Sequence, residues 1–156
     1  YIGELYCKMF SQVYNIDTAC LRYFNVYGER MNLEGAYKLV IAVFAQQHMD
    51  GVPLTITNTG EQRRDFTYVG DVVDANLLAA EAPFDLQGDS FNIGNGNNYS
   101  VNEIADMFGK DYPKEYIEER KGEQRNSKCD TNWTNKVIDW KPKKSLSKYI
   151  KRSISE

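Results

Sequence analysis

The sequence has few cysteines, a single histidine and no long apolar run, and each shortage excludes a class of protein. The three cysteines have no Cys-x-x-Cys spacing, and His48 is the only histidine. A disulfide scaffold and a zinc site are therefore both unexpected. No apolar stretch approaches the roughly 20 residues that a membrane-spanning helix needs. A net charge of -3 argues against a protein that binds nucleic acid by bulk charge. The simplest interpretation is a cytoplasmic protein in a reducing setting, with no membrane and no nucleic-acid partner.

The composition is that of a globular protein, and its first residues have helical spacing. With 156 residues, 42% of them hydrophobic, the chain fits one domain or half of a larger one. An apolar stripe is present from the second residue, with no initiator Met and no N-cap before it. We therefore expect the chain to begin inside a helix of a longer protein, the alternative being a processed natural N-terminus. The stripe, which we expect to be buried, consists of Ile2, Leu5, Tyr6, Met9, Phe10 and Val13.

The rest of the chain alternates between strand-like and helix-like segments, which indicates an α/β fold. Short strands with polar interruptions further suggest a small appended lobe. Asp71, Asp130 and Ser145 are expected to cap helices, and Ser100 with Glu103 has the spacing of a capping box. The expected strands cover 18–24, 54–57, 64–69, 90–93 and a short segment near 116–117; the expected helices cover 39–50, 71–82 and 100–108 and follow Asp130 and Ser145.

Asn25 follows directly after the first expected strand. In open α/β sheets, ligands bind beyond the carboxyl ends of strands. The amide offers two donors and one acceptor, which suit phosphate or sugar oxygens. A turn asparagine that bonds its own backbone explains the position equally well.

Arginines are the second candidate for a binding site. Arg63 and Arg64 begin a strand, where successive side chains point to opposite faces, so one of them can face a site. Arg120 and Arg125 lie in a later loop. Three converging guanidinium groups would suit a diphosphate, whereas exposed ion pairs are the alternative.

Other features have simpler explanations. The Gly94-Asn-Gly96 loop lacks the third glycine of a nucleotide-binding fingerprint, so a tight turn explains it as well. His48 is interpreted as a packing or surface residue. The basic residues of the tail fit a solvated helix face, with a polyanion contact as the alternative. Asp17, Asp71 and Asp74 are interpreted as turn and cap residues.

Five segments, taken together and in this order, resemble the C-terminal half of the extended short-chain dehydrogenase/reductase family, the NAD-dependent nucleotide-sugar epimerases and dehydratases. Residues 1–4 (YIGE) resemble the stretch directly after the family's YxxxK motif. The other four segments are 21–28 (LRYFNVYG), 60–69 (GEQRRDFTYV) continued by 71–76 (DVVDAN), 91–94 (FNIG) with 100–103 (SVNE), and the ending formed by 120–123 (RKGE), Asp130 and 140–142 (WKP).

The resemblance implies the C-terminal part of a Rossmann-like doubly wound sheet plus a small α/β substrate-binding lobe, together spanning residues 1–156. In the family, bound NAD takes a hydride from the sugar while a tyrosine phenolate removes the hydroxyl proton. The glycine-rich loop, most of the cofactor domain and the YxxxK motif would all precede Tyr1. The chain by itself is therefore expected to be inactive, with no catalytic residue and no metal.

By the same resemblance, the chain binds a nucleotide sugar. The implied function is the substrate-binding half of a UDP-glucose 4-epimerase-like enzyme; the alternatives are a 4,6-dehydratase or decarboxylase, and a non-catalytic binding fragment. The complete protein is expected to be a homodimer that pairs partly through its first helix. The implied substrate-binding residues are Asn25, Leu39, Thr55, Thr57, Arg64, Arg120 and Arg125, and the residues near the nicotinamide are Tyr23 and Val26.

Overall fold

The computed structural model describes residues 1–32, 38–119, 122 and 124–154. Helices and strands alternate along the chain, as the sequence predicts. Within these residues, no helix is long and apolar enough to cross a membrane. The elements are, in order, α1 (Ile2–Tyr14), β1 (Ala19–Tyr23), β2 (Val26–Tyr27), α2 (Val40–Met49), β3 (Leu54–Thr57), β4 (Arg63–Asp65), β5 (Thr67–Tyr68), α3 (Val69–Ala80), β6 (Asp89–Ile93), β7 (Asn98–Ser100), α4 (Val101–Phe108), β8 (Lys114–Ile117), α5 (Asn132–Ile138) and α6 (Leu146–Ser153).

The strands pair two by two, and each pair joins distant parts of the chain. β1 runs parallel to β6, β2 to β5, and β3 to β8, whereas β4 and β7 are antiparallel. Parallel strands require a long crossover connection, which the helices between them provide. Three parallel pairs with interleaved helices confirm the predicted α/β architecture.

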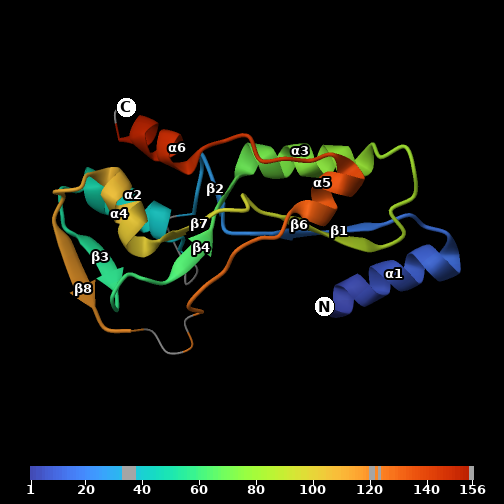
Figure 1. Ribbon diagram of the computed structural model, residues 1–156, viewed down its shortest axis with the longest axis horizontal. Helices are drawn as coiled ribbons and strands as arrows, with labels where there is room; N and C mark the ends of the chain where they lie inside the picture. The colour runs from blue at the N-terminus through green and yellow to red at the C-terminus, as the bar shows by residue number, and fades with distance from the viewer. Residues whose placement is uncertain (33–37, 120–121, 123, 155–156) are drawn as a thin grey trace.

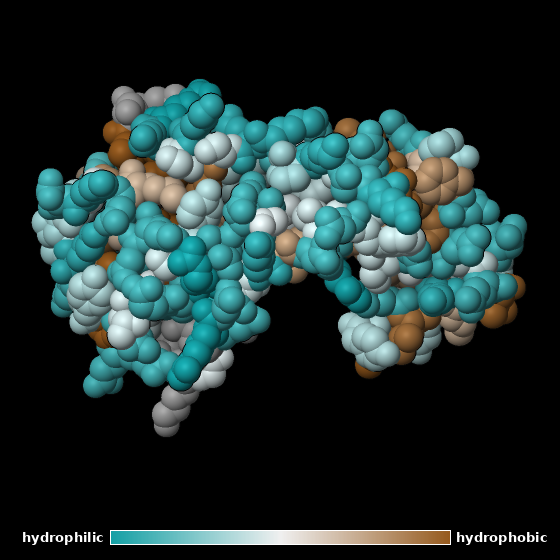
Figure 2. Space-filling view, in the orientation of Figure 1, coloured by the Kyte–Doolittle hydropathy of each residue, from teal (hydrophilic) through white to brown (hydrophobic). Residues whose placement is uncertain are grey.

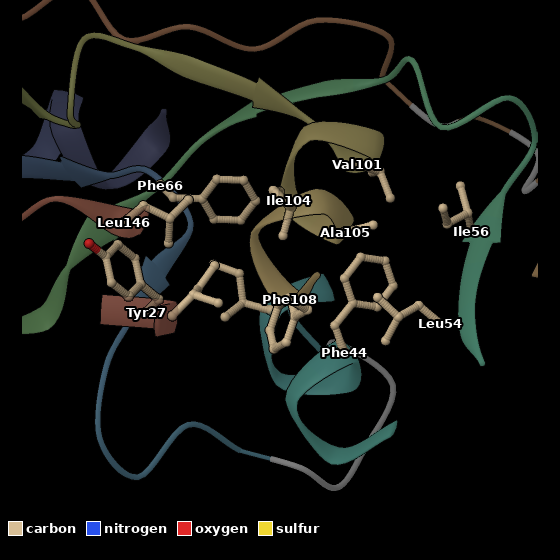
Figure 3. Packing of buried hydrophobic residues seen from close by; sticks show 12 residues of the cluster. Tyr27, Phe44, Leu54, Ile56, Phe66, Val101, Ile104, Ala105, Phe108 and Leu146 are labelled. Carbon is tan, nitrogen blue, oxygen red and sulfur yellow. The ribbon is translucent and has the colours of Figure 1, made fainter. Parts of the chain in front are cut away.

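Two separate hydrophobic cores organise these elements, which form a left and a right group in Figure 1. The first core lies among α2, α4, α6, β2 and β3, where the rings of Phe44 and Phe108 meet edge to face at 6.0 Å. Figure 3 shows the side chains of α4 between Tyr27 at one end of this core and Leu54 at the other. The second core joins α3, α5 and β6 around the buried Trp140.

Local sequence determines the start of α4. The Ser100 hydroxyl accepts a hydrogen bond from the Glu103 backbone N–H at 3.0 Å, and the Glu103 carboxylate accepts one from the Ser100 N–H at 2.7 Å. This reciprocal arrangement satisfies two backbone donors that a helix start otherwise leaves unpaired. The predicted capping box is therefore confirmed.

The first helix forms as predicted, but the expectation that its apolar stripe is buried is wrong. No residue of α1 is buried, and the side chain of Ile2 is 69% exposed. The helix instead packs through its polar side: Glu4 forms an ion pair with Arg22 on β1, and Thr18 donates to the Cys7 carbonyl at 3.0 Å. Figure 2 shows hydrophobic side chains gathered over α1 at the lower right.

Two boundaries differ from the prediction because tertiary contacts decide them. Asp71 does not cap α3, which begins two residues earlier; its buried carboxylate accepts the backbone N–H groups of Lys143 and Lys144, each at 3.1 Å. The expected strand 64–69 is divided at Phe66, so β4 and β5 pair with different partners. The short strands β2 and β7 have no distinct sequence signal.

Candidate functional site

The candidate site is built around β4, whose alternation separates its two arginines. The Arg63 side chain points to Asn98 and Glu103, with Nη2 2.7 Å from Glu103 Oε2. Gln62 and Arg64, one residue to each side, line the opposite face, which borders a cleft. Because strand side chains alternate, Arg64 faces the site, as the sequence allows for one of the pair.

A tight turn leads into β4. Gly60 has a φ of 74°, a left-handed conformation that favours glycine, and its N–H donates to the Thr57 carbonyl at 3.2 Å. A Cβ atom at Gly60 would lie 2.3 Å from Asn102 Oδ1, so the turn packs directly on α4. The turn therefore fixes where β4 begins relative to β3.

A cleft of about 200 Å³ brings together most of the predicted substrate-binding residues. Its walls come from the end of β1, the start of α2, β3 and the outer face of β4. Asn25, Leu39, Thr55, Thr57 and Arg64, which are spread over 40 positions of the sequence, all line it. The remaining lining residues are Lys38, Val40, Val43, Gln62, Phe66, Val101 and Ile117.

Asn25 lies in the wall of this cleft and is held from across the chain. Its Nδ2 donates to the Asp65 carbonyl at 2.6 Å, and its φ of 27° is one that asparagine tolerates better than most residues. The side chain thus bonds a distant backbone group instead of its own. The amide has a second N–H and an oxygen beyond this bond, which are suitable groups for a sugar or phosphate.

The two threonines on β3 are positioned by glutamine side chains. Gln47 on α2 donates to the Thr55 hydroxyl at 2.8 Å and accepts the Thr55 N–H at 3.1 Å. Gln62 donates to the Thr57 carbonyl at 3.1 Å. Together with the half-buried Leu39, β3 forms a wall with both apolar and polar atoms, as a planar base requires.

The predicted arginines do not share one hollow. Arg64 lines the cleft, and its Nη1 donates to the Arg63 carbonyl at 2.8 Å. Arg125 lines an adjoining hollow of about 240 Å³, and Gln62 borders both hollows. The Arg125 carbonyl accepts the Arg63 N–H at 2.9 Å, which holds the later loop against β4. Arg120 lies outside the described residues.

A fully buried carboxylate supports the site from behind. Asp65 accepts the backbone N–H groups of Asn95 at 2.7 Å, Gly96 at 2.9 Å and Cys129 at 3.0 Å. Burial raises the pKa of Asp65, against the opposing effect of these three donors. The backbone N–H groups of the Gly94-Asn-Gly96 loop therefore bind a carboxylate of the chain itself. This favours the interpretation as a tight turn over that as a phosphate-binding loop.

Of the two residues predicted to lie near a nicotinamide, Tyr23 is the last residue of β1 and Val26 is the first of β2. The Tyr23 side chain is 50% exposed, and its hydroxyl donates to Asn76 Oδ1 at 3.0 Å. Val26 is half-buried and packs against the second core. These residues fit an apolar contact with one face of a planar ring, but they do not supply the donors that a dinucleotide's phosphates require.

Histidine and the acidic residues have structural roles. The His48 ring packs 4.8 Å from the Tyr112 ring, and the described part of the chain has no cluster of His, Cys, Asp or Glu suited to a metal ion. Asp17 accepts the Gln87 N–H at 2.8 Å, and Asp74 forms an ion pair with Lys143 at 2.7 Å. The packing interpretation of His48 is therefore confirmed.

Sequence reasoning missed Gln62, which borders both hollows. One signal could have found it, because a residue two positions before Arg64 on a strand shares its face. Lys38, Val43 and Ile117 were also missed. They carry no motif, and the fold alone brings them to the cleft.

Comparisons with known proteins identify the family and the fold. Residues 1–94 match the family described as NAD dependent epimerase/dehydratase. The crystal structure of a Thermotoga maritima UDP-glucose 4-epimerase with UDP-glucose superimposes with a TM-score of 0.88 at 36% identity, covering 99% of this chain and 50% of that one. A Bacillus cereus UDP-glucuronic acid 4-epimerase with UDP-glucuronic acid and NAD gives 0.85 at 28% identity, covering 98% and 49%. A UDP-glucuronic acid decarboxylase of Arabidopsis thaliana is 29% identical over 93% of this chain and 42% of its own length.

The chain spans about half the length of the curated relatives it matches. The structural likeness confirms the predicted fold class, a part of a Rossmann-like α/β protein with parallel strands. The family match covers more than half of the chain, from α1 through β6. The chain therefore belongs to the NAD-dependent epimerase/dehydratase family.

Proposed function

We propose that this chain is the substrate-binding portion of an NAD-dependent UDP-sugar 4-epimerase and that it binds the nucleoside diphosphate in the cleft beside β4. The observation that carries the proposal is that five residues to which the family resemblance assigns substrate binding line this one cleft. The base would lie between Leu39 and β3, and the diphosphate would lie towards Arg64. Arg125, in the adjoining hollow, would contact the far end of the ligand.

The chemistry of the walls supports this orientation. The half-buried Leu39 on one side and β3 on the other offer apolar contact and backbone groups to a flat ring. The Arg64 guanidinium presents several N–H donors in one plane, which matches two phosphate oxygens at once. Asn25 is anchored beside it, so its remaining amide groups can bond the sugar or the phosphate without reorganising.

The proposal is tested by measuring UDP binding to the chain with calorimetry. Arg64→Gln removes a charge-assisted hydrogen-bonding group worth about 1.5–3 kcal/mol, so affinity should fall roughly 10- to 150-fold. Arg63→Gln is the matched control: it removes the same charge one residue away, on the face that bonds Asn98 and Glu103. Equal losses in both variants, or no UDP binding by a folded wild-type chain, would rule out the cleft.

The catalytic groups would come from elsewhere in a longer protein. Residues 1–156 contain no YxxxK motif and no three-glycine phosphate loop, so we propose that the chain alone does not turn over substrate. NAD would accept a hydride from the sugar and return it. Tyr23 and Val26 would contact its nicotinamide. In a chain joined to a cofactor half, Tyr23→Ala should weaken NAD retention while leaving UDP affinity unchanged.

A decarboxylase or 4,6-dehydratase is the second candidate, favoured by the similarity to the Arabidopsis thaliana decarboxylase. By the resemblance, these enzymes share the motifs found in this chain, so the binding cleft does not separate them. Product analysis with UDP-glucose, UDP-N-acetylglucosamine, UDP-glucuronate and dTDP-glucose distinguishes them in the complete protein. A free-standing, non-catalytic binding module would show UDP affinity without turnover even when a cofactor half is added.

We also propose that the complete protein is a homodimer that pairs partly through α1. The exposed stripe on this helix supports the proposal, since Leu5, Tyr6 and Val13 are each more than half exposed. Light scattering of wild-type protein should give twice the monomer mass, and Leu5→Glu with Val13→Glu should give monomers. A strict monomer at high concentration for the wild-type protein would refute it.

A further inference from the structure

Two partly buried thiols, Cys7 on α1 and Cys20 on β1, lie at the contact between these two elements. α1 packs against β1 and β6, and Figure 1 shows it running beside them. Neither thiol lines the cleft that binds the nucleotide in the proposal above. Nucleotide binding therefore does not explain why the fold brings them to the same place.

The alternation of side chains along β1 directs Cys20 at α1. Arg22, two residues after Cys20, forms the ion pair with Glu4 of α1. Thr18, two residues before Cys20, donates to the Cys7 carbonyl at 3.0 Å. Because successive side chains of a strand point to opposite faces, Cys20 shares the face of these two neighbours. Its thiol therefore points to the helix.

The facing side of α1 carries Cys7 at the same level. Glu4, Cys7 and Ser11 follow one another at intervals of three and four residues, which places them on one side of the helix. The Ser11 and Thr18 hydroxyls lie 2.9 Å apart at one end of the contact, and the Glu4 ion pair lies at the other. The helix and the strand thus run in opposite directions, and Cys7 lies between these two contacts, opposite Cys20.

A glycine lets α1 approach closely at this level. Gly88 precedes β6, has a φ of 75°, and donates its N–H to the Thr18 carbonyl at 2.8 Å. A Cβ atom at Gly88 would lie 2.4 Å from the Lys8 Cα and 3.0 Å from the Cys7 carbonyl carbon. The backbone of α1 is therefore close enough for short side chains to meet, and the side chains of Cys7 and Cys20 form a hydrogen bond. A disulfide needs such an approach, because its Cα atoms are about 4.4–6.8 Å apart.

We propose that Cys7 and Cys20 form a dithiol that oxidises reversibly to a disulfide, which fastens α1 to β1. The oxidant would be a low-molecular-weight disulfide such as oxidised glutathione. One cysteine thiolate attacks a sulfur of the oxidant, which breaks the oxidant's S–S bond and releases one of its halves as a thiolate. The second cysteine thiolate then attacks the first cysteine sulfur, forms the internal S–S bond and releases the other half. Two electrons pass to the oxidant, and the two cysteine protons go to the released thiolates.

The surroundings of the pair set the order of the two attacks. Burial raises the pKa of the Cys20 thiol, and its hydrogen bond with Cys7 raises it further. A thiol with a raised pKa has less of the reactive thiolate at neutral pH. Cys7 would therefore attack the oxidant, and Cys20 would resolve the mixed disulfide.

The bond would change how firmly α1 is held. No residue of this helix is buried, and its ion pair to β1 joins partly exposed side chains. The disulfide would close a loop of 14 residues, from 7 to 20, and so restrict the unfolded chain. Oxidation should therefore stabilise the attachment of α1 without any change in the nucleotide cleft.

Buffers of reduced and oxidised glutathione test the proposal, with peptide mass spectrometry after alkylation as the measurement. In the folded chain we expect Cys7 linked to Cys20, with Cys129 reduced. The link should form at least about tenfold more readily than in chain unfolded by urea, because the fold holds the thiols together. Cys20→Ser should stop at Cys7 bound to glutathione. Cys7→Ser is the matched variant, in which Cys20 should react at least about tenfold more slowly with glutathione disulfide.

Two further measurements follow the effect of the bond on the fold. Oxidation should raise the midpoint of thermal unfolding by about 5 °C. It should also slow hydrogen exchange of the α1 amides relative to those of α5, which serve as the internal reference. Arg64→Gln should leave the link unchanged while weakening UDP binding, so the two proposals are tested separately.

Four results would overturn the proposal. The first is a folded chain that carries only mixed disulfides with glutathione. The second is a link that forms equally well in the folded and the urea-unfolded chain, which would show that the fold does not position the thiols. The third is oxidation that joins two copies of the chain instead of Cys7 and Cys20. The fourth is an oxidised chain that melts at a lower temperature than the reduced one, which would show that the bond distorts the contact.

Discussion

The buried carboxylate of Asp65 gives the sharpest test of how the site is held. It has no exposed surface and accepts three backbone N–H groups, one on Oδ1 from Asn95 and two on Oδ2 from Gly96 and Cys129. Asp65→Asn keeps the shape of the side chain but turns one oxygen into a donor. Whichever way the amide is oriented, at least one backbone N–H then faces an NH₂ group.

The expected loss of stability follows from two opposing effects. A buried donor left without an acceptor costs about 1–3 kcal/mol. Against this, the wild-type protein pays a cost for burying the charged carboxylate, which is why burial raises the pKa of Asp65. The neutral amide avoids that cost. The unpaired donor outweighs this relief, because the amide also loses the charge that strengthens the bonds it keeps. We expect Asp65→Asn to lower the free energy of unfolding by about 1–2 kcal/mol.

Urea unfolding followed by circular dichroism at pH 7 measures this change. Asp17→Asn is the control, because Asp17 is exposed and accepts one N–H, which an amide oxygen still accepts. That variant should lie within about 0.5 kcal/mol of wild type. If Asp65→Asn is as stable as wild type or more stable, then the cost of burying the charge dominates. The three hydrogen bonds to Asp65 would then not be what stabilises this part of the site.

Three further predictions follow. Ser100→Ala removes the capping hydroxyl of α4 and should lower the free energy of unfolding by about 1 kcal/mol in the same urea assay. Tyr27→Phe should be neutral or stabilising by up to about 1 kcal/mol in thermal melts, because the buried Tyr27 hydroxyl has no hydrogen-bond partner among the described residues; a large loss would reveal a hidden partner. Burial raises the pKa of the Cys129 thiol to about 12 from an ordinary 9.0. The contribution of this buried thiol to the free energy of unfolding is therefore fully present below pH 9 and is lost as the pH rises through 12. Iodoacetamide at pH 8.5 should therefore modify Cys129 at least about 100-fold more slowly than Cys7 in the folded chain, as peptide mass spectrometry would show.

Features with a local cause were predictable from sequence. The strand at 54–57 matches its predicted bounds, because its alternating residues lie between two turn signals. The capping box at Ser100 is reproduced atom for atom, since its partners are three residues apart. The cleft was partly predictable for a different reason: Asn25 and Arg64, which line it, lie within motifs that resemble the family.

Features decided by distant contacts were not predictable. Asp71 resembles an N-cap by type and position, yet its carboxylate bonds backbone groups 72 and 73 residues later. The stripe on α1 has the spacing of a buried face, but periodicity shows only that a face is apolar, not what covers it. Gln62 shares a strand face with Arg64, which the sequence could have shown, but that it borders both hollows depends on how distant segments pack around β4.

The alternation along β4 makes the site sensitive to small insertions. If one residue were added or lost between Gly60 and Arg63, the strand would slip by one position and turn every side chain to the other face. Arg63 would then enter the cleft, while Arg64 would be left opposite Glu103. Because both are arginines, the slipped strand would still present a guanidinium to a ligand, although Gln62 would no longer lie between the two hollows. The two adjacent arginines would thus preserve the positive charge of the cleft but not its shape. Relatives that differ in the length of this turn should therefore differ in which ligands they accept.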